Sequence, residues 1–101
     1  MPGDTTVLGA VYAAHETLAI GAQVSRLTKT IFKVRSHAFI TCEGGAVRFW
    51  LDEGTPTSMS GHLLEPGDVI ILDRVDQLDG FRCISGDGGH AMLQCSYGET
   101  R

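Results

Sequence analysis

The segment Ala46–Leu72 constrains the fold more than any other part of the sequence. It opens with AVRFWLD, in which apolar and other residues alternate with the period of two that is typical of a half-buried strand. The polar run DEGTPTS then favours turns, and the apolar runs GHLL and VIIL follow on either side of EPGD. Pro66 fixes φ at one corner of that tetrapeptide, and Gly67 tolerates the positive φ of a type II turn. We expect the other strands to complete a sheet around this hairpin-like unit.

The remaining strands are predicted from the same alternation. Glu43–Gly45 is a short glycine-containing link between two alternating runs, which predicts a hairpin. The further strands expected are Leu18–Val24, Leu27–Arg35, Ala38–Cys42, Phe81–Ser85 and His90–Tyr97. Seven or eight short strands in 101 residues, without a long helical pattern, predict an all-β fold. The specific expectation is a single-domain antiparallel β-sandwich or jelly roll.

Alternation also predicts which side chains face the core. In the strand expected at 90–97, Ala91, Leu93, Cys95 and Tyr97 share one face. The acidic connection 73–80 is expected on the surface, held to the core by Val75 and Leu78. The residues predicted to be buried across the strands are Val47, Phe49, Leu51, Ile71, Leu93 and Cys95.

Residues 1–17 are expected to form an N-terminal arm, and residues 18–101 the sandwich domain. The stretch Val7–Ala14 is apolar without a clear period, so its structure is left open. A short helix over Val11–Leu18 is one possibility, because alanine-rich segments favour helix. A first strand of the sandwich, or an arm that docks on a neighbouring molecule, is equally compatible with this stretch.

Composition argues against several classes of protein. The formal net charge of −4 disfavours a general nucleic-acid binder. No apolar run approaches the length of a membrane span, and the start of the chain lacks the positive region of a signal peptide. The three cysteines are an odd number, and each falls in an expected strand. We therefore predict that Cys42, Cys83 and Cys95 are reduced and buried.

No catalytic or metal-binding pattern stands out. His15, His37, His62 and His90 are far apart in sequence, and the HxH pair of a cupin metal site is missing. The sequence has no GxSxG, and its many carboxylates in turns suit solubility and backbone capping. We predict a non-enzymatic protein without a metal or cofactor.

Two groups of residues are candidates for a binding surface. Arg48 and Trp50 fall on the opposite face of their strand from Val47 and Phe49, and such a pair is a common anchor in protein interfaces. Alternatively, this face packs under a loop or under the arm. Lys29, Lys33 and Arg35 would form a basic ridge, which a solvated strand face explains equally well. The expected interface residues are Val7, Leu8, Val11, Tyr12, Arg48 and Trp50.

The central and C-terminal parts of the chain resemble a group of small tailed-bacteriophage virion proteins of the capsid-decoration, cement or head-fibre kind. The segments that carry the resemblance are Ala38–Thr41, Glu43–Gly45, Val47–Phe49, Leu51–Asp52, Gly54–Thr57, Gly61–Leu64, Gly67–Asp68 and Phe81–Arg82. It covers about residues 36–97 and departs from the pattern at Glu53, which is inserted where an aspartate usually runs straight into Gly-Thr. The resemblance implies a β-rich structural protein, with no catalytic residues to carry over.

The leading hypothesis is thus a virion protein, assembled in the host cytoplasm, that decorates or cements a capsid through a sandwich face and its arm. Its expected partner is the major capsid protein or another virion protein. A homo-oligomer is expected, and a trimer would suit the resemblance. The alternative is a small-molecule or carbohydrate-binding β-sandwich of cupin or lectin type that uses Trp50 as a stacking platform.

Overall fold

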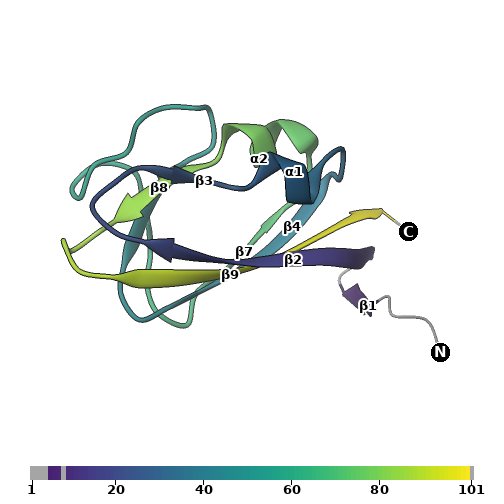
Figure 1. The fold of residues 1–101 in the computed structure, drawn as a ribbon, viewed down its shortest axis with the longest axis horizontal. Coiled ribbons are helices and arrows are strands. Elements are labelled where there is room, and N and C mark those ends of the chain that lie inside the picture. The colour runs from purple at the N-terminus through teal and green to yellow at the C-terminus, as the bar shows by residue number, and fades with distance from the viewer. Residues whose placement is uncertain (1–4, 8, 101) are drawn as a thin grey trace.

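The protein is a sandwich of two antiparallel sheets (Figure 1). The computed structural model describes residues 5–7 and 9–100, with only the backbone described at residues 5–7. The strands are β1 (Thr5–Val7), β2 (Ala10–Ile20), β3 (Ser25–Arg26), β4 (His37–Glu43), β5 (Val47–Trp50), β6 (His62–Leu64), β7 (Val69–Leu72), β8 (Arg82–Ser85) and β9 (Ala91–Thr100), and the helices are α1 (Lys29–Phe32) and α2 (Val75–Gly80). Sheet A has the strand order β1-β2-β9-β4-β7, and sheet B the order β3-β8-β5-β6. The predicted all-β antiparallel sandwich is confirmed.

The centre of sheet A is β9, which pairs with β2 on one side and β4 on the other. Its alternation is as predicted: Ala91, Leu93, Cys95 and Tyr97 are buried against sheet B, while the intervening residues face outward. These four side chains belong to one continuous core between the sheets. The alternation in the sequence thus predicted correctly which face of β9 points into the core.

Most of the predicted core residues are buried, with one clear error. Val47, Phe49, Leu93 and Cys95 are buried, and Leu51 is half-buried. Ile71 is 38% exposed, so its predicted burial is wrong. Leu72 and the half-buried Ile70 face the core in its place. The reason is that all four residues of β7 are apolar, so alternation cannot tell one face from the other.

The turn at Glu65–Asp68 has the predicted type II geometry but a different role. The Asp68 N–H donates to the Glu65 carbonyl at 2.9 Å, and Gly67 has a φ of +94°. This turn joins β6 in sheet B to β7 in sheet A, so the two strands are not a hairpin. The link at 44–46 likewise crosses from β4 in sheet A to β5 in sheet B, and the hairpin predicted there is also wrong. Neither local pattern shows that the chain changes sheets.

The segment expected to be a strand over Leu27–Arg35 contains α1 instead. Phe32 is fully buried and packs against Tyr97 with 5.8 Å between ring centroids, and Leu27 is fully buried as well. Lys33 follows with φ of +54°, and its N–H donates to the Lys29 carbonyl at 2.7 Å. The helical turn therefore brings Leu27 and Phe32 into the core, which an extended chain with the predicted alternation would not do.

Two other local expectations also change. The connection 73–80 contains α2, in which Leu78 is buried as predicted but Val75 is 39% exposed. The strand expected at Leu18–Val24 ends at Ile20, as the last part of β2.

β2 is a long strand inside sheet A, between β1 and β9. Its ladder with β9 runs from Ala10 to Ile20, with a register shift between Tyr12 and Ala14. A helix over Val11–Leu18 is therefore wrong, and residues 10–20 form a strand of the sandwich, preceded in the chain by β1. The boundary expected after residue 17 falls within this strand.

Candidate interaction surface

The outer face of sheet B carries the predicted Arg48 and Trp50 pair. In β5 the side chains of Val47 and Phe49 are buried, whereas those of Arg48 and Trp50 are half-buried on the other face. The ladders place Arg48 opposite Leu63 of β6 and Ile84 of β8, and Trp50 opposite Arg82 of β8. We call this group the Trp50 surface: Arg48, Trp50, Leu63, Arg82 and Ile84.

Trp50 is held by its neighbours but remains partly open to solvent. Its indole meets the His62 ring edge-on, with 5.2 Å between centroids, and His62 also lies 5.4 Å from the Phe49 ring. The loop after β5 passes close by, since a Cβ at Gly54 would lie 3.5 Å from Cδ1 of Trp50. Both predictions for this face are therefore partly correct. The loop covers one side of the Trp50 indole, and part of the indole is open to solvent.

Arg48 fastens the far end of the same loop. Its Nη1 donates a hydrogen bond to the Gly61 carbonyl at 3.0 Å. Gly61 has a φ of +125°, and a Cβ there would lie 3.1 Å from the backbone N and O of Phe49. The guanidinium Nε is buried and, within the described part of the chain, has no hydrogen-bond partner. Arg48 thus holds the end of the loop between β5 and β6 in place at the edge of the Trp50 surface, and it also contributes a positive charge to that surface.

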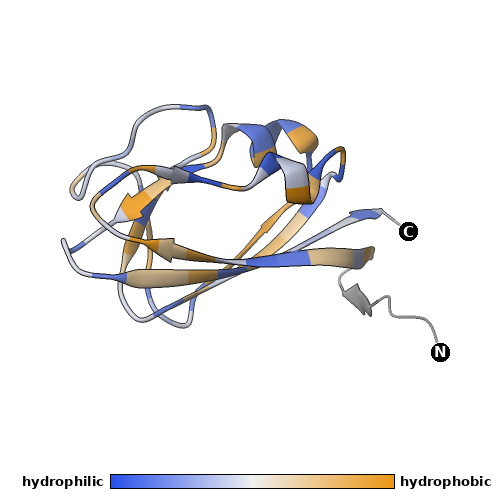
Figure 2. Cartoon of the chain, in the orientation of Figure 1, coloured by the Kyte–Doolittle hydropathy of each residue, from blue (hydrophilic) through white to orange (hydrophobic). Residues whose placement is uncertain are grey.

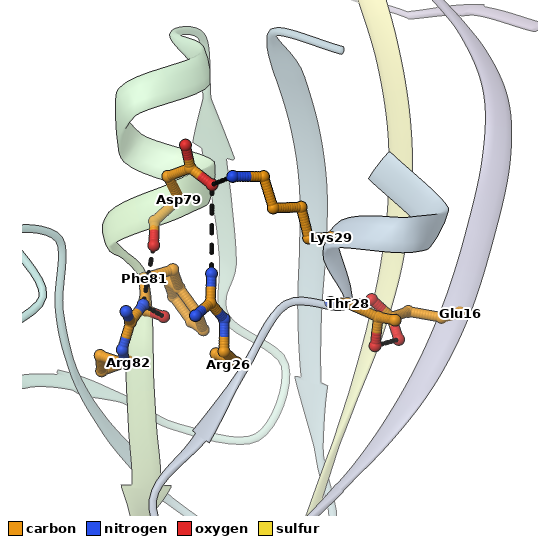
Figure 3. Close-up of polar contacts among 7 residues, drawn as sticks. All are labelled: Glu16, Arg26, Thr28, Lys29, Asp79, Phe81 and Arg82. Carbon is orange, nitrogen blue, oxygen red and sulfur yellow. Dashed lines mark hydrogen bonds and ion pairs between the residues drawn. The ribbon is translucent and has the colours of Figure 1, made fainter. Parts of the chain in front are cut away.

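Arg82 and its surroundings bring further positive charge to this side (Figure 3). Its Nη1 donates to the carbonyls of Asp79 at 2.7 Å and Phe81 at 2.9 Å, and so binds the end of α2. The Asp79 carboxylate pairs with Lys29 at 3.4 Å and with Arg26 at 4.0 Å. Arg26 lies opposite Arg82 in the ladder between β3 and β8. Sequence reasoning missed Arg82, although alternation in RCIS indicates that its side chain lies on the outer face of its own strand.

The basic ridge expected from Lys29, Lys33 and Arg35 is wrong because its strand does not exist. Lys29 lies in α1 and pairs with Asp79, whereas Lys33 ends the helix. Arg35 instead lines an open cavity of about 310 Å³ together with Val11, Ala13, Glu99 and Thr100. The three cations therefore do not share a face.

The structure does not bring the predicted arm residues to the Trp50 surface. Val11 lines the cavity beside Arg35, in sheet A. Tyr12 is 8% exposed, and its ring meets that of Phe39 at 87° with 6.2 Å between centroids. Phe39 belongs to β4, also in sheet A. Leu8 and the side chain of Val7 lie outside the described residues.

The three thiols are buried, as predicted, and free. Burial raises the pKa of Cys83 to about 12 and that of Cys95 to about 12. The pKa of Cys42 is raised by burial and then by the charges of Asp68 and Glu43. Protonated, buried thiols are poor nucleophiles and poor metal ligands.

The histidines are spread over the molecule, and within residues 9–100 no group of three His, Cys, Asp or Glu side chains could hold a metal ion. No helix in the part of the chain that the structure describes is both long and apolar enough to cross a membrane. Comparisons with protein-family models, curated proteins and solved structures found no match to this chain.

Proposed function

We propose that this chain is a non-enzymatic structural protein of a tailed-phage virion, which decorates or cements the capsid through the Trp50 surface. The resemblance of residues 36–97 provides the class of protein, and the sandwich fold fits that class. The observation that supports the binding role is a half-exposed Trp50 next to Arg48 and Arg82 on an outer sheet face. Tryptophan and arginine are the residues most enriched among the anchors of protein interfaces.

The setting of Trp50 favours binding because little has to be ordered when a partner arrives. His62 and the Gly54 backbone restrict the indole, and the Arg48 guanidinium is already bonded to Gly61. Each rotamer-rich side chain immobilised on association costs about 0.5–1.5 kcal/mol, and preorganisation avoids part of that cost.

The proposed partner is the major capsid protein or another virion protein, and the place of action is the virion after assembly in the host cytoplasm. A homo-oligomer, with a trimer as the state that best suits the resemblance, remains part of the proposal. Deletion of residues 2–14 is not a clean test of assembly, because it removes residues 10–14 of β2 from their ladder with β9. Light scattering of the intact chain and of Trp50→Ala tests self-association without that damage.

The decisive experiment uses the genes beside this one. If they encode a capsid protein, that protein is assembled into shells, and the purified chain is sedimented with them. We expect co-sedimentation of the wild type and at least about tenfold weaker binding by Trp50→Ala, which corresponds to about 1.4 kcal/mol. Met92→Ala is the matched control, since Met92 is 38% exposed but lies in sheet A.

Each outcome is informative. Wild-type chain that stays in the supernatant with intact shells would exclude the decoration role. Equal sedimentation of Trp50→Ala would keep the role but exclude this surface.

The alternative of a carbohydrate-binding sandwich uses the same tryptophan. A sugar stacks on an open aromatic face, and one side of Trp50 is already occupied by the Gly54 region. Isothermal titration calorimetry of the chain with a panel of mono- and oligosaccharides tests it directly, because a heat signal does not depend on Trp50, the one tryptophan of the sequence. A saturable heat signal that Trp50→Ala abolishes would favour this alternative over the virion role.

A further inference from the structure

Strand β7 is an edge of sheet A, and its own four residues include no charge or proline that would discourage pairing. It has β4 on one side and is the last strand in the order of the sheet. Edge strands normally carry lysine, proline or a charge that discourages other chains from adding on. The four residues Val69–Leu72 are all apolar, and Figure 2 shows this strand in the hydrophobic colour.

The turn before β7 decides which backbone groups face the open edge. The Gly67 N–H donates to the Cys42 carbonyl at 2.8 Å, and the Cys42 N–H donates to the Asp68 carbonyl at 3.1 Å. Gly67 and Asp68 thus both lie opposite Cys42. Because the first of the two is a glycine with positive φ, this irregularity is a G1 bulge. From there hydrogen-bonded pairs recur at every second residue, at Ile40–Ile70 and Ala38–Leu72. The N–H and C=O groups of Val69 and Ile71 therefore point away from β4.

The same two residues expose their side chains. Val69 is 50% exposed and Ile71 is 38% exposed. Within the described residues, no backbone hydrogen bond from outside the β4 ladder reaches either of them. A row of outward N–H and C=O groups with alternate β-branched side chains is complementary to one kind of ligand, an extended chain that adds as a further strand.

Charges on both sides of β7 restrict what that chain can be. Glu65 and Asp68 precede the strand, and Asp73 and Asp76 follow it. Arg74, the one lysine or arginine between residues 65 and 76 of the sequence, lies 4.0 Å from the Asp76 carboxylate. If two copies paired Val69 of one with Ile71 of the other, Asp68 would face Leu72 and Asp73 would face Gly67, so that at each end Asp68 of one copy would lie one position away from Asp73 of the other. Like charges this close repel each other, which disfavours a strand pair between two copies.

We propose that the free edge of β7 binds an extended segment of a different polypeptide, with small apolar residues at alternate positions and lysine or arginine at both ends. The backbone groups of Val69 and Ile71 would provide the hydrogen bonds, and the acidic residues at either end would provide the selectivity. This site lies in sheet A and is separate from the Trp50 surface, so it does not depend on the virion role.

The test uses the full chain and two synthetic peptides. Both have alternating valine and serine in the middle, and one has two lysines at each end where the other has two glutamates. Binding is followed by NMR of the ¹⁵N-labelled chain. We expect the lysine peptide to slow hydrogen exchange at the Val69 and Ile71 amides and to bind at least about tenfold more tightly than the glutamate peptide. Added salt should reduce this difference.

Substitutions locate the site. Ile71→Pro removes an outward N–H and leaves the bonds to β4 intact, a position at which an edge strand tolerates proline. We expect this variant to keep its fold and lose peptide binding, whereas Met92→Lys, elsewhere in sheet A, should bind as the wild type does. Should Ile71→Pro fail to fold, Val69→Lys provides the same test, because its charge repels the lysine peptide.

Three results would overturn the proposal: equal binding of the two peptides, unchanged exchange at the two amides, or a wild-type dimer that dissociates in Ile71→Pro. The last would identify a second copy as the occupant. If Trp50→Ala loses shell binding but keeps peptide binding, the β7 proposal stands. If Ile71→Pro loses peptide binding but keeps shell binding, the decoration role stands.

Discussion

The ladder of β2, β9 and β4 and the segment around α1 are stabilised in different ways. In the ladder, apolar residues alternate along β9 and enter a continuous core. The α1 segment has one helical turn, and long-range polar contacts hold it (Figure 3). The Glu16 carboxylate accepts hydrogen bonds from the Thr28 N–H at 2.9 Å, from the Thr28 hydroxyl at 2.6 Å and from the Tyr97 hydroxyl. At the start of α1, the Asp79 carboxylate pairs with Lys29, whose own side chain is 65% exposed.

This difference predicts that neighbouring parts of one core tolerate substitution differently. The ladder loses stability when apolar volume is removed, because packing and burial are what it contributes. The α1 segment should respond to the loss of particular polar partners, and by amounts that depend on how well water can replace them.

Leu93→Ala should give the largest loss. Leu93 is fully buried in β9, between partners in β2 and β4. Truncating a buried leucine costs about 2–5 kcal/mol of unfolding free energy, a large share of what a small domain possesses. Denaturant unfolding measures the loss. Met92→Ala, one residue away on the outer face, should change the free energy by only about 0.5 kcal/mol.

The contrast also explains what the sequence could predict. Period-two alternation, a signal contained within a few residues, predicted the all-β fold, the inward face of β9 and the burial of the thiols. The α1 turn did not, because what favours it is Glu16, more than ten residues earlier in the chain. Which residues of β7 face the core depends on the hydrogen bond between Gly67 and Cys42, again a contact between distant segments. In the Trp50 surface, Arg48 and Trp50 were predicted from their own strand, whereas Arg82 required knowing that β5 and β8 are neighbours.

Glu16→Gln should give the next largest effect. The amide has one acceptor oxygen, so its NH₂ group would face the donors that Oε2 now accepts from, Thr28 N–H and Tyr97 O–H. Hydrogen bonds to a charged group contribute about 1.5–3 kcal/mol, and we expect a loss of unfolding free energy in that range. Glu99→Gln, at an exposed position of β9, is the control. A loss no larger than that of the control would mean that burial of Leu27 and Phe32 alone holds the α1 segment.

The buried thiols predict how the core responds to alkaline pH. The pKa of Cys83 is about 12 in the folded chain, against 9.0 for a free thiol, because burial disfavours the thiolate. A raised folded pKa means that the stabilisation is complete below about pH 9 and is lost as pH rises from there towards 12. Well above pH 9 each such thiol should lower the unfolding free energy by about 1.4 kcal/mol per pH unit.

Cys83→Ala should make the fall of unfolding free energy with pH less steep, because one buried thiol no longer contributes. Cys95 and Tyr97, whose pKa values burial also raises, continue to contribute. The slope of unfolding free energy against pH is the measurement, since the slope is insensitive to the cavity that alanine creates. An identical slope in Cys83→Ala and the wild type would show that this thiol ionises without cost in the fold.

The smallest effect is expected at Lys29. Its ammonium lies 3.4 Å from the Asp79 carboxylate, but its side chain is 65% exposed and that of Asp79 is 36% exposed. Water and salt screen such a pair, and exposed ion pairs contribute about 0–1 kcal/mol. Lys29→Met keeps the aliphatic stem and removes only the charge, so its loss should fall in that range and shrink further at high salt. The same carboxylate also faces Arg26 at 4.0 Å, which leaves it a partner in the variant. A loss as large as that of Glu16→Gln would mean that the Lys29–Asp79 ion pair holds α1 as firmly as the hydrogen bonds of Glu16 do, and the distinction between the two anchors would fail.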